Sequence, residues 1–191
     1  MDRKCPLSVL TYPTVSQLRE LVVDSVTAAT VETILSNCIH LYSLHVIYRR
    51  SPSGQNGVAY IEDSLDLLHH SSVKKLILEN TADFSSEHLL KIAHLEELIL
   101  RRVAGTFTVE SMIEAITRCP NLCTLVLYHP PPDQITRSDI RSVLDAAPKL
   151  HTFAYVDRDS FPSMEALQEM TSTSYPHIKD PVFISDAYGR R

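Results

Sequence analysis

The chain has 191 residues, of which 44% are hydrophobic, and its formal net charge is −5 at pH 7. This is enough apolar material for a continuous core, and the mild acidity gives no electrostatic case for nucleic-acid binding. No stretch approaches the roughly 20 apolar residues of a membrane span, so we expect neither a nucleic-acid nor a membrane partner and a cytoplasmic location, with the nucleus as the alternative.

A motif of the form L-x-x-L-x-L recurs along the chain. Its clearest copy is Leu-Glu-Glu-Leu-Ile-Leu at residues 95–100, and the other copies start at Leu18, Leu41, Val73, Leu122 and Leu150, with a poor seventh at Ile178. The starts lie 22 to 32 residues apart. Self-similarity at this spacing is typical of stacked structural repeats. We therefore predict one repeat domain over residues 15–185, with a lead-in at 1–14 and a tail at 186–191.

Each repeat is predicted to hold a short strand followed by an amphipathic helix. We expect strands near residues 18–23, 43–48, 75–79, 95–100, 125–128 and 153–156, and helices near 27–38, 61–69, 84–92, 109–118, 136–147 and 164–170. Residues 49–60 contain two glycines and several other turn formers, which predicts an exposed mobile insertion. Thr136-Arg137-Ser138-Asp139 fits a capping box at a helix start. Because a helix separates successive strands, the strands should pair in parallel.

A second register lies three residues before each motif start. Small apolar residues occupy it at Cys38, Cys119 and Ala147, and proline follows it at Pro120, Pro148 and Pro176. Proline cannot continue a helix, and cysteine and alanine suit a buried slot, so this register should mark the turn from helix back to sheet. We interpret the four cysteines (Cys5, Cys38, Cys119 and Cys123) as reduced thiols of an intracellular protein.

The motif strands, the helices and the junction Cys119-Pro120-Asn121-Leu122 resemble leucine-rich-repeat proteins. They are most similar to the irregular, cysteine-containing repeats found beside F-boxes in ubiquitin-ligase receptors, and the resemblance covers residues 15–157. With the strand and helix pattern it implies an α/β leucine-rich-repeat solenoid of about six to seven repeats. The parallel sheet would line the concave face of a horseshoe arc, and the helices would line the convex face.

The same resemblance implies a function without catalysis. It suggests substrate recognition for an SCF-type ubiquitin ligase, with the ligase adaptor bound through an F-box that the short lead-in cannot hold. The alternative is a structural segment that scaffolds neighbouring domains of a longer protein. The chain also departs from such repeats three residues after each strand's last apolar position, where Asn or Cys is usual. The residues there are Val26, Arg49, Thr81, Val103, Pro130 and Arg158, so the usual side-chain ladder is not expected.

The candidate site is the face of the sheet opposite the helices. In each strand, the residue between the last two core positions should point there, which gives the row Val22, His45, Ile77, Ile99, Val126 and Ala154, with Val182 as its extension. Strand propensity alone favours Val and Ile, whereas a large exposed apolar stripe would mark a docking surface. We predict that this row binds a protein of unknown identity, together with the flanking residues Tyr48, Lys75, Glu97, Arg101 and Tyr128.

Burying one Val or Ile stabilises a protein by about 1.5–3 kcal/mol. We therefore expect something to cover part of the row, either a partner or the chain's own residues from Tyr175 onward. The first and last strands should be exposed sheet edges, which predicts self-association.

We predict no catalytic, cofactor or metal site. Cys119, Cys123 and His129 have a spacing within the range of zinc ligands, but Cys119 falls in the buried register and no second pair is nearby. The sequence His69-His70 ends a predicted helix, which favours a structural role. The sequence contains no Gly-rich phosphate loop, and its spacing indicates no catalytic arrangement of Ser, His and an acidic residue. Ser51 and Ser53 are candidate phosphorylation sites in the insertion.

Overall fold

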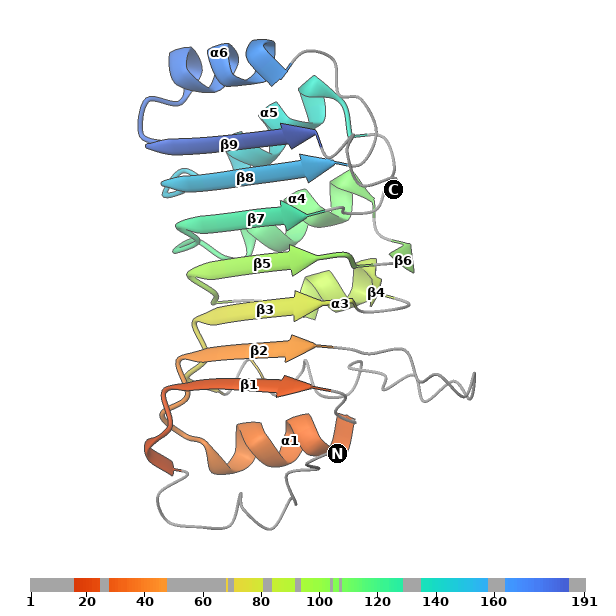
Figure 1. The fold of residues 1–191 in the computed structure, drawn as a ribbon, viewed down its shortest axis with the longest axis vertical. Helices are drawn as coiled ribbons and strands as arrows, with labels where there is room; N and C mark the ends of the chain where they lie inside the picture. The colour runs from red at the N-terminus through yellow and green to blue at the C-terminus, as the bar shows by residue number, and fades with distance from the viewer. Residues whose placement is uncertain are drawn as a thin grey trace.

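The computed structural model describes residues 16–24, 28–47, 68, 71–80, 84–91, 94–103, 105–106, 108–128, 135–157 and 164–185. Three predicted segments lie outside these residues: the lead-in at 1–14, the insertion at 49–60 and the tail at 186–191. The predicted helix at 61–69 also lies outside them, apart from Leu68. The main feature is a seven-stranded, all-parallel sheet whose strands follow one another in chain order (Figure 1). Its strands are β1 Glu20–Asp24, β2 Ser43–Ile47, β3 Lys75–Glu79, β5 Glu97–Arg101, β7 Thr124–Tyr128, β8 Thr152–Asp157 and β9 Asp180–Ser185.

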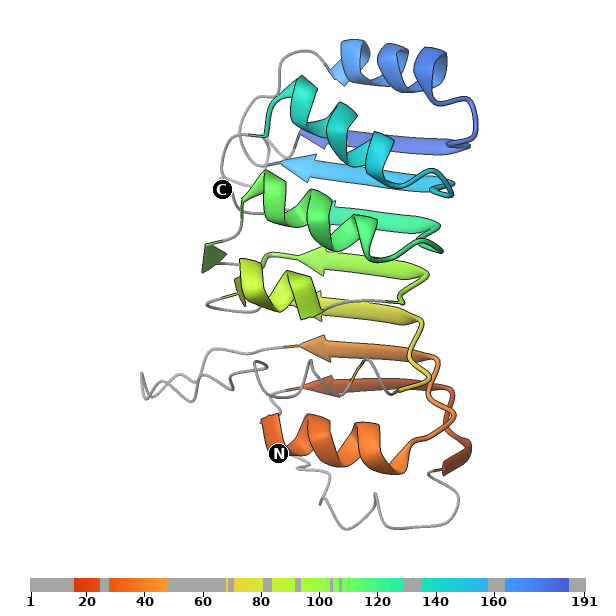
Figure 2. The same cartoon turned by 180° about the vertical axis from the view of Figure 1, so that it is seen from behind.

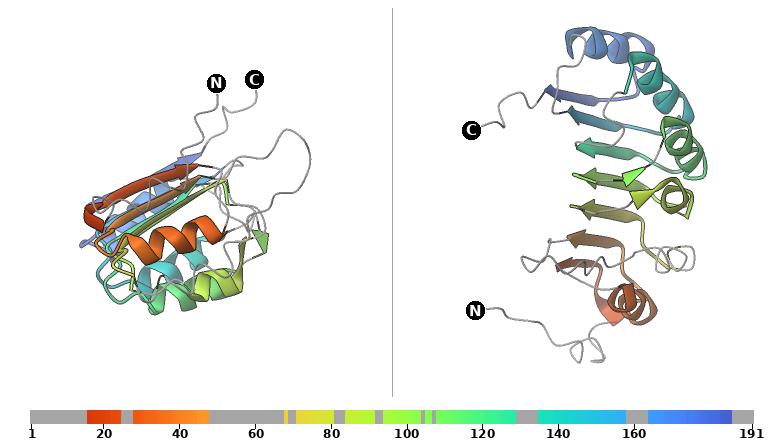
Figure 3. Two further views of the ribbon diagram at one scale, coloured as in Figure 1. Left: turned by 90° about the horizontal axis from the view of Figure 1, so that it is seen from below. Right: turned by 90° about the vertical axis from the view of Figure 1, so that its right-hand side faces the viewer.

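Helices cover one face of this sheet (Figure 2). They are α1 Ala28–Asn37, α3 Ser86–Lys91, α4 Val109–Thr117, α5 Arg137–Ala146 and α6 Met164–Ser174. Seen along the sheet, the helices lie on the outer side of a shallow arc and the strands on its inner side (Figure 3). The predicted α/β class, the parallel pairing and the placement of the helices on one side are thus confirmed.

A second, two-stranded parallel sheet was not predicted. It pairs β4 Phe84–Ser85 with β6 Gly105–Thr106, just before α3 and α4. These strands are too short to leave a readable alternation of apolar and polar residues in the sequence.

The core lies between the sheet and the helices, and the motif leucines form it. Aligned positions of neighbouring strands stack in rows, as in Leu44, Leu76, Leu98, Leu125 and Phe153, all of which are buried. The first residue of each motif is buried as well, except for the partly buried Leu18, but it precedes the strand. Leu122, for example, donates its N–H to the Cys119 carbonyl across 2.9 Å, so it belongs to the turn and not to the ladder. The strand predicted at 95–100 therefore runs from Glu97 to Arg101.

The predicted junction from helix to sheet is confirmed where the structure describes it. Cys38, Cys119, Ala147 and Tyr175 are all buried. Each of their carbonyls accepts a hydrogen bond from the N–H three residues later, across 2.9, 2.9, 3.0 and 2.9 Å respectively. Burial raises the pKa of the Cys38 and Cys119 thiols. The same turn thus returns the chain to the sheet in different repeats.

At the other end of the strands, backbone contacts extend the ladder. Asn80 and Arg102 have left-handed backbones, with φ of 57° and 50°. The Asn80 N–H donates to the Arg101 carbonyl across 2.9 Å, and the Arg102 N–H donates to the Tyr128 carbonyl across 2.7 Å. Val103, at a position where Asn or Cys is usual in leucine-rich repeats, is buried. Backbone bonds and an apolar side chain therefore occupy this turn.

Capping residues fix the starts of two helices. The predicted box at α5 is confirmed, because Thr136 Oγ1 accepts from the Asp139 N–H across 3.3 Å and Asp139 Oδ2 accepts from the Thr136 N–H across 2.8 Å. A second box joins Thr108 and Ser111 at the start of α4. It was not predicted, since serine replaces the usual Glu or Gln at the third helical position.

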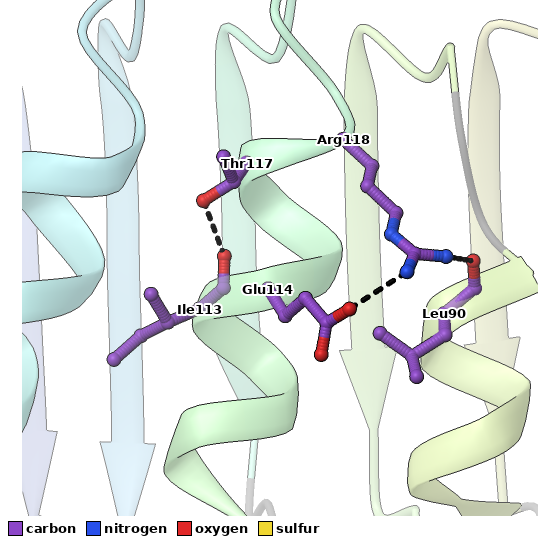
Figure 4. Close-up of polar contacts among 5 residues, drawn as sticks. All are labelled: Leu90, Ile113, Glu114, Thr117 and Arg118. Carbon is purple, nitrogen blue, oxygen red and sulfur yellow. Dashed lines mark hydrogen bonds and ion pairs between the residues drawn. The ribbon is translucent and has the colours of Figure 1, made fainter.

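Arg118, at the end of α4, connects two neighbouring helices (Figure 4). Its Nη2 donates to Glu114 Oε1 across 2.7 Å, and its Nη1 donates to the Leu90 carbonyl of α3 across 3.1 Å. Leu90 lies in the last turn of α3, where carbonyls lack helical partners and a positive charge is favourable. One side chain therefore caps the preceding helix and holds the two helices together.

Candidate functional site

The face of the sheet opposite the helices is hereafter called the open face. Because side chains alternate along a strand, every second residue of each strand points to it. The register aligns the predicted row across all seven strands, from Val22 through His45, Ile77, Ile99, Val126 and Ala154 to Val182. We call these residues the central row. Its alignment was correctly predicted, including the extension to Val182.

The central row is much more covered in its middle than at its ends. Val22 is 62% exposed and Val182 is 40% exposed, whereas Ile99 is only 9% exposed. The central row is therefore not a continuous exposed apolar stripe, because its centre is covered within the sheet itself. Strands lie only about 4.8 Å apart, so neighbouring side chains cover one another, and the stems of long charged residues in the flanking rows add to this cover.

The flanking positions carry complementary charges on neighbouring strands. Lys75 Nζ lies 2.8 Å from Glu97 Oε2. Glu79 Oε2 lies 3.3 Å from His45 Nε2 and 3.8 Å from Arg101 Nη1. Partly exposed pairs of this kind contribute about 0–1 kcal/mol each, so their main effect is to fix the side chains over the central row.

Sequence reasoning placed Lys75, Glu97, Arg101 and His45 in the site but missed Glu79, which contacts two of them. Its position two residues after Ile77 was the available signal, since residues two apart in a strand share a face. Tyr128 aligns with Arg101 in the adjacent strand and is half-buried. Tyr48 lies outside the described residues.

Tyr42 extends the site at the edge where the strands begin. Its hydroxyl donates to Glu96 Oε2 across 3.3 Å, and its side chain is 38% exposed. The pKa of this phenol is raised, first by burial and then by the negative charge of Glu96. Exposed aromatic and charged residues beside apolar ones are common at the rims of protein interfaces.

Of the two alternatives for covering the central row, the chain's own residues from Tyr175 onward do not cover it in the part that the structure describes. Residues 180–185 form β9, which pairs with β8 in the plane of the sheet. They therefore extend the central row through Val182.

The two cysteines considered for metal binding, Cys119 and Cys123, lie in different environments. Cys119 is buried at the end of α4, whereas Cys123 is half-buried and its thiol donates to the Glu96 carbonyl across 3.2 Å. His129 and the pair His69-His70 lie outside the described residues. Within the described part of the chain, no group of three or more His, Cys, Asp or Glu residues could hold a metal ion. None of the helices described there is long and apolar enough to cross a membrane.

The open face thus combines the largely apolar central row, which crosses all seven strands, with paired charges that are confined to β2, β3 and β5. A scan against models of protein families finds no match to this chain, and a search of curated proteins finds none either.

Proposed function

We propose that this chain is a leucine-rich-repeat domain that binds another protein on the open face, without catalysing a reaction. One observation supports this most directly. Parallel sheets normally have both faces covered, yet the described helices cover only one face here, and the other keeps apolar residues at every position of the central row except His45. A partner protein would bury the exposed part of that row.

The leucine-rich-repeat assignment is supported by the strand order. A doubly wound sheet reverses its strand order at a switch point and carries helices on both faces. In this sheet the order follows the chain without reversal, and each described helix lies on the same side (Figure 3). Together with the recurring L-x-x-L-x-L motif, this arrangement favours a stack of repeats over a doubly wound fold.

A narrower proposal is substrate recognition within an SCF-type ubiquitin ligase. It rests on the similarity of the junction Cys119-Pro120-Asn121-Leu122 to the repeats of F-box proteins. Co-purification of the ligase adaptor with the endogenous protein would support it. Stable isolation of the endogenous protein in other complexes, without the adaptor, would favour the alternative of a structural segment that scaffolds its neighbouring domains.

The proposal can be tested by comparing two aspartate substitutions on opposite sides of the molecule. Val126→Asp places a charge in the central row, and Gln168→Asp places the same charge on an exposed position of α6. Affinity purification with quantitative mass spectrometry should show partners that are lost with Val126→Asp and retained with Gln168→Asp. Thermal melting of both variants must accompany it, since Val126 is half-buried.

If Val126→Asp lowers the melting temperature but leaves every captured partner unchanged, the open face is not the binding surface. Ile99 is unsuitable for this comparison, because its burial would make any polar substitution destabilising in itself.

A further inference from the structure

The edge at which the strands begin carries a group of basic residues beside β8 and β9 (the left edge in Figure 1). Lys149 and His151 lie in the turn between α5 and β8, and His177 and Lys179 lie in the turn between α6 and β9. The side chains of all four are exposed. We call these four residues the basic rim.

Two residues of the basic rim, His151 and Lys179, lie next to each other on neighbouring turns. His151 and Thr152 stand between two fully buried residues, Leu150 and Phe153, so both are directed away from the core. The Lys179 N–H donates to the His151 carbonyl across 2.9 Å. Because neighbouring strands lie about 4.8 Å apart, one extended segment can contact both side chains.

The other two residues are oriented by contacts that leave donors available. Lys149 Nζ donates to Asn121 Oδ1 across 2.7 Å, and an ammonium group has two further N–H bonds to donate. The ring of His177 lies edge-on to the ring of Tyr175, with the centroids 6.1 Å apart. These contacts hold the side chains in place without neutralising the charge of the lysine.

The lysines of the basic rim differ from those at the same edge of the sheet's centre. Lys75, at the start of β3, lies 2.8 Å from the Glu97 carboxylate in the next strand. Within the described part of the chain, Lys149 and Lys179 make no ion pair, although Asp180 follows Lys179 in the sequence. The rim is therefore a positive surface on a protein whose net charge is −5.

The basic rim adjoins the part of the open face that has no paired charges among the described residues. There the central row consists of Val126, Ala154 and Val182, and Val182 is 40% exposed. Ala154 follows His151 by three residues, a span of about 10 Å in an extended chain. A segment that covers this part of the row therefore reaches the rim within a few residues.

We propose that the basic rim binds an acidic segment of a partner protein, in which two or more Asp or Glu carboxylates lie beside the apolar residues that contact the central row. The inference rests on the proposed protein-binding function and names the chemistry of the partner's segment. The ammonium groups of Lys149 and Lys179 would pair with the carboxylates, and the rings of His151 and His177 would donate N–H bonds to them.

Other anions suit the basic rim less well. Bidentate recognition of phosphate favours arginine, and the turns at 119–124, 147–152 and 175–180 contain none. Nucleic-acid binding commonly uses about 6–10 phosphate contacts, whereas the rim has two lysines and the chain has a net negative charge. Donors distributed over two turns match separate carboxylates of an extended segment.

The test titrates two peptides into the whole chain labelled with 15N. The acidic peptide is Gly-Asp-Glu-Asp-Glu-Gly, and the neutral peptide has Asn and Gln in place of Asp and Glu. In about 0.1 M salt, where charges are screened beyond about 10 Å, the acidic peptide should shift the amide resonances of the basic rim. The neutral peptide should not shift them.

Charge reversal provides the second part of the test. The double substitution Lys149→Glu and Lys179→Glu should weaken binding of the acidic peptide about tenfold or more, since two attractive pairs become repulsive. Arg137→Glu with Arg141→Glu changes the net charge equally on exposed positions of α5 and should retain most of the affinity. Circular dichroism of both variants shows whether the fold is kept.

The inference is overturned if the acidic peptide does not bind, if both peptides shift the rim equally, or if the two double variants weaken binding alike. Tighter binding of a phosphorylated peptide or of a thymidine dodecamer at the rim would assign it to phosphate. A dimer in size-exclusion chromatography that the lysine variant dissociates would assign it to a second copy of the chain.

The partners captured from cells separate this inference from the proposed function. Those lost with Val126→Asp should also be weakened by the double lysine variant and retained by the double arginine variant. Loss with Val126→Asp but full retention by the lysine variant would overturn the inference and leave the proposed function standing. Peptide binding at the rim without any effect of Val126→Asp would refute the proposed function, but not the affinity of the rim for acidic segments.

Discussion

The hydroxyl of Tyr175 donates a hydrogen bond to Asp145 Oδ1 across 2.6 Å. Tyr175 occupies the junction position after α6, where earlier repeats have Cys38, Cys119 or Ala147. Its larger side chain reaches α5, where the hydroxyl oxygen also lies 3.3 Å from the Arg141 carbonyl oxygen. It thereby connects the last two described helices.

We expect Tyr175→Phe to lower the free energy of unfolding by about 1 kcal/mol, the usual net contribution of a hydrogen bond, or somewhat more because the acceptor is charged. Urea denaturation would measure it. Tyr42→Phe is the matched control, since it removes a hydroxyl bonded to Glu96 on a more exposed side chain. An equal loss from both substitutions would contradict the role given to Tyr175.

The same contact predicts how stability depends on pH. Burial, the hydrogen bond to Asp145 and its charge raise the pKa of Tyr175 to about 12, whereas an unfolded tyrosine titrates near 10. A pKa raised in the folded state gives a stabilising contribution that is complete below about pH 10 and is lost as the pH rises toward 12. The difference in unfolding free energy between the unmodified chain and Tyr175→Phe should therefore stay constant below pH 10 and shrink above it. A difference that persists unchanged at pH 11.5 would contradict this.

Adjacent residues of β7 should differ sharply in their contribution to stability. Leu125 is 0% exposed in the core, whereas Val126 is half-buried on the open face. Leu125→Ala should cost about 2–5 kcal/mol, because it removes buried methyl groups and leaves a cavity. Val126→Ala should cost clearly less. Chemical denaturation of both variants measures this, and similar costs would indicate that the open face is as well packed as the core.

The cysteines should react in a defined order. Burial raises the pKa of the Cys38 and Cys119 thiols, and the reactive species is the thiolate. Cys123 is more accessible. Brief treatment with N-ethylmaleimide, followed by peptide mass spectrometry, should therefore find Cys123 modified before Cys38 and Cys119. Simultaneous modification of the three under native conditions would mean that the junction opens readily.

Arg118 should stabilise the helix layer through α3 more than through its own helix. Arg118→Ala removes both the bond to the Leu90 carbonyl and the pair with Glu114, and should cost about 0.3–1 kcal/mol. Glu114→Gln weakens only the exposed pair within α4, whose contribution is about 0.2–0.5 kcal/mol. Thermal melting of the two variants would separate these effects, and the prediction fails if Glu114→Gln costs as much as Arg118→Ala.

Much of this architecture could be predicted because it depends on local periodicity. The alternation within each motif identified the core residues of six strands, and the breaks at Pro120, Pro148 and Pro176 located the junctions. Even the poor copy at Ile178, with proline in its middle core position, forms β9. Short elements without periodicity, such as β4 and β6, could not be predicted in this way.

The candidate site was only partly predictable, because exposure depends on neighbours from other repeats. Each strand pattern shows which residues share the open face, and that was sufficient to align Val22 with Val126. It does not show that Ile99 is covered while Val22 stays exposed. The exposure of each residue depends on whether a neighbouring strand with long side chains lies on both sides of its own strand.

By itself, then, the sequence determined the repeat, its order of strands and helices and the residues of the core. These features follow from the local periodicity of apolar residues within stretches of about 30 residues. Only the tertiary structure decided the contacts between repeats, such as Glu79 between His45 and Arg101 and the hydrogen bond from Tyr175 to Asp145. Such contacts depend on how far each side chain reaches across the register, and the periodicity of the sequence does not record that quantity.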